Sequence, residues 1–335
     1  MGACKEAAVP GKGIDPDDIR FFSGSSNPAL AGAIAAHLGV PLDPTGIKRY
    51  SNDCMAIQLG ASVRSRRVFI VQSFSPPVND HLMELLMMLD AARGAAACEV
   101  HAVIPYLSFA RSDKKDAPRI SITARLVADL LQTAGATHVM TMVLHSPQVH
   151  GFFGIPADPL TSRPVFREYF KTLDLDGTIV VSPDAGHADS AARFAHDLCL
   201  PVTSGTKHRI SDTEVKVEVL GRQVTGFKRA LVYDDEISTG GSVAAICEIL
   251  VTQGVKDIWV VGTHGVFVRN GLERLAAIPQ VTKIAVTDTV HIPPERRHPK
   301  LVVLSVAPIF GEAIKCNFMR RSISDLFVYG ENCGV

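Results

Sequence analysis

Ala230-Leu-Val-Tyr-Asp-Asp-Glu-Ile-Ser-Thr-Gly-Gly-Ser242 is the stretch that decides the fold, because it joins an apolar run to a helical pattern through a glycine turn. The apolar run Ala230–Tyr233 predicts a strand that is buried on both faces. Gly241–Gln253 repeats apolar residues at helical spacing and predicts the helix that follows. A strand that leads into a helix in this way is half of the βαβ unit from which parallel sheets are built.

The same alternation recurs along the chain, so we predict an α/β protein whose mainly parallel sheets are flanked by helices. Other short apolar runs predict strands at Val68–Gln72, Val100–Ile104, Thr137–Met142, Thr178–Ser182, Ile258–Gly262, Ile284–Thr287 and Leu301–Leu304. Other helical patterns cover Pro28–Leu38, His81–Ala96 and Ser121–Ala134.

A length of 335 residues favours two domains. The Pro/Gly-rich stretch Gly151–Pro164 is the best boundary, and we expect domains at residues 1–158 and 159–335. Ser204–Gly226 is polar and lacks a clear period, so it predicts either a mobile loop or a β-hairpin.

Composition excludes several classes of protein. Lys+Arg and Asp+Glu balance at 34 each, so there is no net positive field for nucleic acid. The chain has no apolar run of the ~20 residues needed to cross a membrane, and its first twenty residues lack the apolar core of a signal peptide. The seven cysteines are widely spaced and odd in number, which argues against a disulfide framework or a zinc site. We expect a cytoplasmic protein that binds neither nucleic acid nor membranes.

The glycine turn after Ala230–Tyr233 suits a phosphate. Glycines let backbone N–H groups approach an anion, and the start of the helix adds a positive dipole. Thr239 and Ser242 add hydroxyl donors, and Asp234 and Asp235 are placed to hold vicinal sugar hydroxyls, directly or through Mg²⁺. The alternative is that these acids and hydroxyls only cap the helix.

Asp234–Ser242 resembles the ribose-5-phosphate loop shared by phosphoribosyltransferases and ribose-phosphate pyrophosphokinases. The rest of the chain, from about Phe21 to Phe327, is similar to the second family in the family's order. The segments that carry this resemblance are Asn79–Asp90, Ile104-Pro-Tyr-Leu-Ser-Phe-Ala-Arg-Ser-Asp-Lys-Lys-Asp116, His145-Ser-Pro-Gln-Val-His-Gly-Phe-Phe153, Ser182-Pro-Asp-Ala-Gly186, Gly205-Thr-Lys-His-Arg209, Thr263-His-Gly-Val-Phe267 and Thr287-Asp-Thr289.

The resemblance implies two phosphoribosyltransferase-like domains and assembly as a homohexamer. It implies transfer of the diphosphoryl group of ATP to the anomeric hydroxyl of ribose 5-phosphate, with Mg²⁺ as cofactor, in nucleotide biosynthesis. Two alternatives stay open: a phosphoribosyltransferase, and a non-catalytic regulatory homologue of the same family.

The resemblance also implies roles for individual residues. Lys207 and Arg209 would be catalytic, in a flexible loop that closes over the diphosphoryl group, although spacing alone favours an exposed basic loop. His145 and Asp184 would contact Mg²⁺, although Asp184 after a strand also fits a simple cap. The residues implied to bind ATP are Tyr50, Asn52, Cys54, Arg111, Ser112, Asp113, Asp116 and His145. Those implied to bind ribose 5-phosphate are Arg209, Asp234, Asp235, Ser238, Thr239, Gly240, Gly241 and Ser242. Those implied for an allosteric phosphate and ADP site are Ser62, Arg64, Arg119, Ser322, Ser324 and Phe327.

The sequence departs from the family pattern at several positions. Tyr50-Ser-Asn-Asp-Cys54 stands where the family has Phe-Ser-Asp-Gly-Glu, so the acids that face adenine have shifted or vanished. Val143 replaces an Asp near the metal-proximal His145, and His187 replaces the second glycine of Pro-Asp-x-Gly-Gly. Ser238 stands where an acid often precedes Thr-Gly-Gly. These changes bear on nucleotide preference and on metal geometry.

Overall fold

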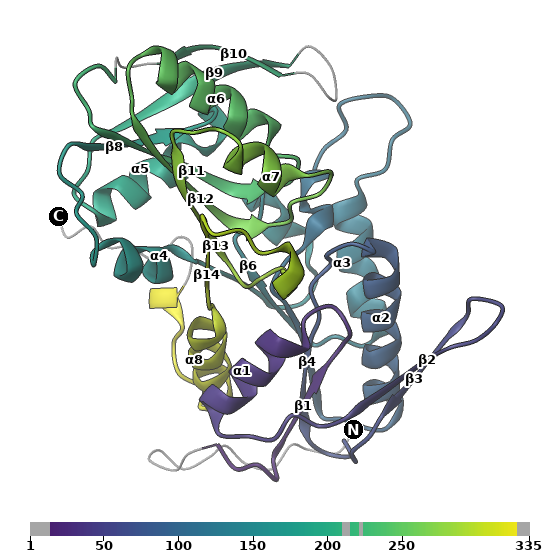
Figure 1. Ribbon diagram of the computed structural model, residues 1–335. Coiled ribbons are helices and arrows are strands. Elements are labelled where there is room, and N and C mark those ends of the chain that lie inside the picture. The colour runs from purple at the N-terminus through teal and green to yellow at the C-terminus, as the bar shows by residue number, and fades with distance from the viewer. Residues whose placement is uncertain (1–13, 210–214, 221–223, 327–335) are drawn as a thin grey trace. The chain divides into compact units, whose positions relative to one another are not determined.

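The protein is described by a computed structural model that covers residues 14–209, 215–220 and 224–326 (Figure 1). The chain folds into two compact units. The first unit holds the described residues up to Thr161, then Thr289–His291, and finally the described residues from Val306 onward. The second unit holds Ser162–Asp288 and Ile292–Ser305.

The first unit is built on a parallel sheet in the order β1-β4-β5-β6-β7. Its strands are β1 (Ile19–Ser23), β4 (Arg67–Val71), β5 (Glu99–Ile104), β6 (His138–Met142) and β7 (Ala157–Leu160). Its α-helices are α1 (Pro28–Leu38), α2 (Val78–Gly94), α3 (Thr123–Ala134) and α8 (Ala307–Phe318), and its 3₁₀ turns are η1 (Ser108–Arg111), η2 (Pro147–Phe152) and η5 (Ser324–Leu326). In Figure 1, α1 and α8 lie side by side, as do α2 and α3, and each pair is in direct contact.

Local sequence explains how these elements begin and end. The Asn27 side chain accepts a hydrogen bond from Leu30 N at the start of α1, and Gly39 ends the helix at a φ of 69°. Every residue of β4 and β6 is buried, which is why both read as continuous apolar runs. α2 and α3 cover one face of this sheet with apolar side chains such as Leu85, Met88 and Leu131.

A separate hairpin projects from the first unit (Figure 1). Its strands β2 (Thr45–Arg49) and β3 (Met55–Leu59) pair antiparallel, with Arg49 opposite Met55. Residue 53 turns the chain with a positive φ of 68°, a conformation that Asp tolerates better than most residues. The hairpin therefore carries Tyr50–Cys54 at its tip.

The second unit is built on a seven-stranded sheet in the order β10-β9-β8-β11-β12-β13-β14, parallel except where β9 meets β10. Its strands are β8 (Thr178–Ser182), β9 (Val202–Arg209), β10 (Val215–Leu220), β11 (Arg229–Ile237), β12 (Asp257–Gly265), β13 (Val281–Thr287) and β14 (Leu301–Leu304). Its α-helices are α4 (Arg163–Phe170), α5 (Ala188–Asp197), α6 (Gly241–Thr252) and α7 (Gly271–Ala276), and its 3₁₀ turns are η3 (Ala185–His187) and η4 (Pro294–Arg296).

Side chains of β11 alternate between the two faces of this sheet, as a strand requires. Ala230 and Val232 join the apolar core beneath α6 and α7. Leu231 and Tyr233 join the opposite core, which α4 and α5 cover with Phe166, Phe170 and Phe194. Covering both faces with helices buries a mainly parallel sheet of this size.

The second core is strongly aromatic. Phe194 stacks on Tyr233 with ring centroids 4.5 Å apart and meets Phe166 and Phe170 edge-on at 6.3 and 6.0 Å. Trp259, the one tryptophan of the chain, stacks on Phe170 at 5.7 Å and carries the Arg229 guanidinium 3.8 Å from its ring centroid.

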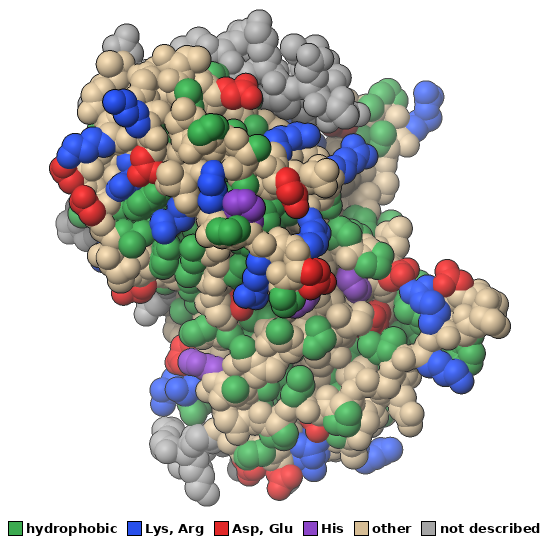
Figure 2. Space-filling view, viewed as in Figure 1, with side chains coloured by type: hydrophobic (Ala, Val, Ile, Leu, Met, Phe, Trp, Pro, Cys, Tyr) green, Lys and Arg blue, Asp and Glu red, His purple; other side chains and the backbone are tan. Residues whose placement is uncertain are grey.

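The predicted fold class is confirmed: each unit is an α/β layer structure with a mainly parallel sheet. Ser204–Gly226 contains the β9–β10 pair, which is the hairpin of the two alternatives. No helix among the described residues is long and apolar enough to span a membrane. Charged side chains of both signs are interspersed over the face seen in Figure 2.

Four cysteines carry free thiols: Cys54, Cys199, Cys247 and Cys316. Cys98 is disulfide-bonded. Cys4 and Cys333 lie outside the described residues.

Phe194→Ala should destabilise the second unit by about 3–5 kcal/mol, because it removes a fully buried ring from a stacked cluster. Thermal unfolding followed by circular dichroism checks this value. His196→Ala, on the exposed side of the same helix, should change the stability by no more than about 0.5 kcal/mol. Equal effects of the two substitutions would contradict this packing.

Candidate functional site

Three carboxylates gather at the carboxyl edge of the second sheet, where ligands of parallel α/β sheets usually bind. Asp184 follows the end of β8, while Asp234 and Asp235 lie within β11. β11 pairs with β8 only as far as Val232, whereas its pairing with β12 continues to Ile237. The two aspartates therefore lie where β11 has lost its neighbour on the β8 side. We call Asp184, Asp234 and Asp235 the acid cluster.

Asp184 caps the short turn η3. Its Oδ1 accepts hydrogen bonds from the backbone N–H of Gly186 at 3.0 Å and of His187 at 3.3 Å. The capping role that the sequence left open is thus present in the structure. The carboxylate is held rigidly as a result, with its Oδ1 beside the His187 ring.

Asp234 and Asp235 do not cap the helix that follows them. The N-cap of α6 is Gly240, which has no side chain, and Asp234 Oδ1 instead accepts a hydrogen bond from Asp235 N at 2.9 Å. Burial and the charge of Asp235 raise the pKa of Asp234 well above its usual range, and the charge of His187 opposes this shift. A carboxyl whose pKa is shifted by burial and by a specific neighbouring charge is a candidate functional residue.

His187 completes this group, with its ring nearly enclosed. Nδ1 lies 3.4 Å from Asp184 Oδ1 and 3.8 Å from Asp234 Oδ1, and Nε2 lies 3.3 Å from Asp235 Oδ1. Burial of the ring lowers the pKa of His187, but hydrogen bonds to Asp184 and Asp235 and the charges of Asp235 and Asp234 outweigh burial and raise the pKa to about 11. The ring is therefore a cation among the acids at neutral pH.

Sequence reasoning noted His187 only as a replaced glycine and did not assign it to the site. The available signal was a histidine three residues after an aspartate at the end of a strand, facing a second strand that ends in two acids. That signal becomes specific only when the strand order makes β8 and β11 neighbours.

Ser238–Ser242, which we call the phosphate loop, turns tightly between β11 and α6. Gly240 adopts a φ of 71°, a left-handed conformation that favours glycine. A Cβ at Gly271 would lie 2.4 Å from the Ser238 carbonyl oxygen, so the backbone of α7 packs directly against this loop. Because Gly240 offers no capping side chain, the first backbone N–H groups of α6 suit an anion.

Lys207 and Arg209 belong to β9, next to β8 in the sheet. Their side chains lie outside the described residues, so their catalytic role stays a prediction.

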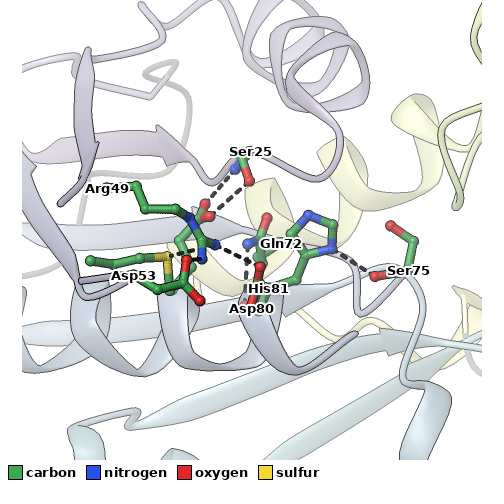
Figure 3. A network of polar contacts seen from close by, with 9 residues as sticks. Ser25, Arg49, Asp53, Gln72, Ser75, Asp80 and His81 are labelled. Carbon is green, nitrogen blue, oxygen red and sulfur yellow. Dashed lines mark hydrogen bonds and ion pairs between the residues drawn. The ribbon is translucent and has the colours of Figure 1, made fainter. Parts of the chain in front are cut away.

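The residues predicted to face the nucleotide base lie at the tip of the β2–β3 hairpin in the first unit. Tyr50, Asn52 and Cys54 are exposed there. Arg49 holds the base of the tip through ion pairs with Asp53 and, at 2.6 Å, with Asp80 at the start of α2 (Figure 3).

The same network fixes the neighbouring loop of the first unit. Glu84 of α2 accepts hydrogen bonds from the backbone and hydroxyl of Ser25, and Gln72 donates to the His81 carbonyl oxygen (Figure 3). His81 Nδ1 in turn lies 2.7 Å from the Ser75 carbonyl oxygen. The hairpin and the carboxyl ends of β1 and β4 thus share one anchor, which is α2.

The predicted triphosphate segment follows β5. Arg111 ends η1 and is exposed, as is Asp116, while Ser112 accepts a hydrogen bond from Thr123 N at the start of α3. Asp113 accepts a 2.6 Å hydrogen bond from Ser146 Oγ, which brings the segment after β5 to the segment that carries His145. His145 belongs to the first unit and Asp184 to the second.

Five of the six residues predicted for a regulatory site are described, and all five belong to the first unit. Ser62 and Arg64 lie between β3 and β4, and Arg119 lies before α3 with a φ of 64°. Ser322 and Ser324 follow α8 with their hydroxyls 2.8 Å apart. Phe327 lies outside the described residues.

Two family models match this chain. Residues 19–135 match the N-terminal domain of ribose phosphate pyrophosphokinase, and residues 204–328 match the phosphoribosyl synthetase-associated domain.

Whole proteins match as well. A ribose-phosphate pyrophosphokinase of Deinococcus radiodurans is 48% identical over 314 residues, covering 92% of this chain and 98% of its own. The enzyme of the same name from Caldanaerobacter subterraneus is 41% identical over 312 residues, covering 93% and 98%. The crystal structure of phosphoribosylpyrophosphate synthetase from Mycobacterium smegmatis aligns with a TM-score of 0.84 at 33% identity, covering 90% of this chain and 99% of that one.

If Ser238–Ser242 binds ribose 5-phosphate as the sequence predicts, Gly271→Ala should weaken that binding, because the new methyl group would push the Ser238 carbonyl and reshape the loop. Loss of one hydrogen bond to the charged phosphate would cost roughly 1.5–3 kcal/mol, or about tenfold or more in affinity. Calorimetric titration measures the effect. Gly32→Ala in α1, where the new methyl group would meet no atom within 4 Å, is the matched control. Unchanged affinity in Gly271→Ala would show that the loop is not held by this contact.

Proposed function

The chain belongs to the ribose-phosphate pyrophosphokinase family, and from that premise we propose how its residues transfer the diphosphoryl group of ATP to the anomeric hydroxyl of ribose 5-phosphate. In this reaction the hydroxyl oxygen attacks the β-phosphorus of ATP, the bond from that phosphorus to the α-phosphate oxygen breaks, and AMP leaves. The products are AMP and 5-phosphoribosyl 1-diphosphate, and the hydroxyl proton is released.

The observation that carries the sugar-phosphate proposal is the pairing of the phosphate loop with the acid cluster on one edge of one sheet. The 5-phosphate would take hydrogen bonds from the backbone of Ser238–Ser242 and from the hydroxyls of Thr239 and Ser242, where Gly240 and Gly241 leave room. Asp234 and Asp235 would hold the ribose hydroxyls, directly or through Mg²⁺. The missing side-chain cap on α6 supports this reading over simple helix capping.

Mg²⁺ is proposed as the cofactor because the acid cluster offers the carboxylate oxygens that this hard cation prefers. When bound, Mg²⁺ would neutralise charge on phosphate oxygens. Asp184 of the second unit and His145 of the first stay the proposed metal contacts, and the cap that fixes Asp184 would preorganise its carboxylate.

The nucleotide is proposed to bind the first unit. Arg111 would clamp the triphosphate with its planar fork, together with Ser112, Asp113, Asp116 and His145. The hairpin tip with Tyr50, Asn52 and Cys54 would face the base. Since Asn52 both donates and accepts hydrogen bonds, discrimination against guanine should be looser than an acid would give.

The direct test of the function is an assay of the whole protein with ATP, ribose 5-phosphate and Mg²⁺. AMP and the diphosphate product should form in equal amounts. No turnover would favour a regulatory homologue, and consumption of 5-phosphoribosyl 1-diphosphate with a base would favour a phosphoribosyltransferase. Regulation by phosphate and ADP through Ser62, Arg64, Arg119, Ser322, Ser324 and Phe327, a homohexameric state and a cytoplasmic location stay predictions.

Asp235→Asn should weaken ribose 5-phosphate binding about tenfold or more, since a hydrogen bond to a charged group contributes roughly 1.5–3 kcal/mol. Calorimetry gives the affinity, and circular dichroism shows whether the variant still folds. Glu248→Gln, at an exposed position of α6, should leave the affinity as it was. An Asp235→Asn variant that binds the sugar phosphate normally would remove Asp235 from the ribose site.

Lys207→Ala should lower kcat by about 10²–10³, as removal of a preorganised stabiliser of transition-state charge does. The KM for ribose 5-phosphate should change much less, because the contact would form only as the charge develops. Steady-state kinetics separate the two parameters, with the exposed Lys256→Ala as the control. Near-normal turnover in Lys207→Ala would exclude Lys207 from the mechanism.

A further inference from the structure

His187 places a ring inside the acid cluster, where glycine is usual in this family's pattern. Its side chain is only 16% exposed, and its two nitrogens face different carboxylates. Nε2 lies 3.3 Å from Asp235 Oδ1, and Nδ1 lies 3.4 Å from Asp184 Oδ1. The ring therefore bridges the end of β8 to β11.

The two nitrogens of the ring face carboxylate oxygens that a bound cation would need as ligands. Asp184 Oδ1 already accepts two backbone hydrogen bonds from η3, and the same atom faces His187 Nδ1. A magnesium ion binds carboxylate oxygens at about 2.0–2.1 Å and demands near-octahedral geometry. The ring lies within hydrogen-bonding distance of the Oδ1 atoms of both carboxylates, so a cation that bound both of these atoms would have to take its place.

We propose that His187 is a specificity-determining residue of this site: it holds Asp184 and Asp235 and must be displaced before a divalent cation binds them. This inference rests on the proposed function of the acid cluster. A free cation then binds only the fraction of molecules in which the ring has moved away, and its apparent affinity falls by that fraction.

As a consequence, the acid cluster would select a cation that is bound to the phosphate of a substrate over a free cation. A displaced His187 would need a new acceptor for its N–H groups, and the phosphate oxygens of a substrate are such acceptors whereas a hydrated free cation is not. His187 would thus keep free cations out of the acid cluster until a phosphorylated substrate is present.

The test is binding of Mn²⁺, the probe in place of Mg²⁺, to the whole protein at pH 7.5 without nucleotide or sugar. Electron paramagnetic resonance of the free ion gives the affinity. His187→Gly and His187→Gln should each bind Mn²⁺ about tenfold more tightly than the parent, if the ring occupies the cluster about nine-tenths of the time. His196→Gln, on the exposed side of α5, should match the parent.

Two further variants make the outcome specific. Adding Asp235→Asn to His187→Gly should abolish the gain, which locates it at the acid cluster. Glycine adds backbone freedom, so the His187→Gly protein could fail to fold. In that case the Mn²⁺ affinity of His187→Gln decides the question. Unchanged Mn²⁺ affinity in the folded variants would overturn the proposal, and weaker affinity would overturn it by making His187 a ligand. AMP formation by the parent is measured separately, so a failed function and a failed role for His187 remain distinguishable.

Discussion

The site depends on one constraint in the second sheet: β11 extends beyond the point at which its pairing with β8 ends. Both neighbours pair with β11 up to Val232, after which only β12 continues. The strand is thereby kept extended through Ile237 while its other edge opens, and the acids in the opened part are held by a rigid backbone. A loop at this position would leave Asp234 and Asp235 free to turn toward water, whereas the strand keeps Asp235 buried, Asp234 partly buried and both beside His187. The phosphate loop begins as soon as this strand ends.

Keeping acids in such a place opposes stability, because burial disfavours their charged forms. The raised pKa of Asp234 is the sign of that cost, and His187 offsets part of it by placing positive charge among the carboxylates. Burial of apolar side chains on both faces of the sheet offsets this cost. α4 and α5 contribute to a mainly aromatic core on one face, and α6 and α7 to a mainly aliphatic core on the other. The buried charges of the unit are thus gathered at the carboxyl edge of its sheet, away from the two apolar cores.

Much of the architecture could be predicted from the sequence, since fully buried strands such as β4, β6 and β8 read as continuous apolar runs. β7, with the sequence Ala-Asp-Pro-Leu, could not, because its proline is tolerated only at the sheet edge that it occupies. α4 begins at Arg163 inside a Pro/Gly-rich stretch that resembled a linker. At the site, the glycine turn of Ser238–Ser242 and the helix that follows it could be predicted because their sequence signal is local, and the phosphate-binding role of the turn stays a prediction. The role of His187 was not, because its partners in β11 become neighbours only through the strand order.

The aromatic core also places the tryptophan fluorescence of the protein in one of the two units. Trp259 is the only tryptophan in the sequence, and it is buried in the second unit between Phe170 and the Arg229 guanidinium. Its emission therefore reports on the environment of that unit alone, while far-ultraviolet dichroism averages over helices of both. When the two signals are recorded in one denaturant titration, coincident curves would mean that the units unfold as a single cooperative system. Separated curves would assign the emission change to the half that carries the phosphate loop.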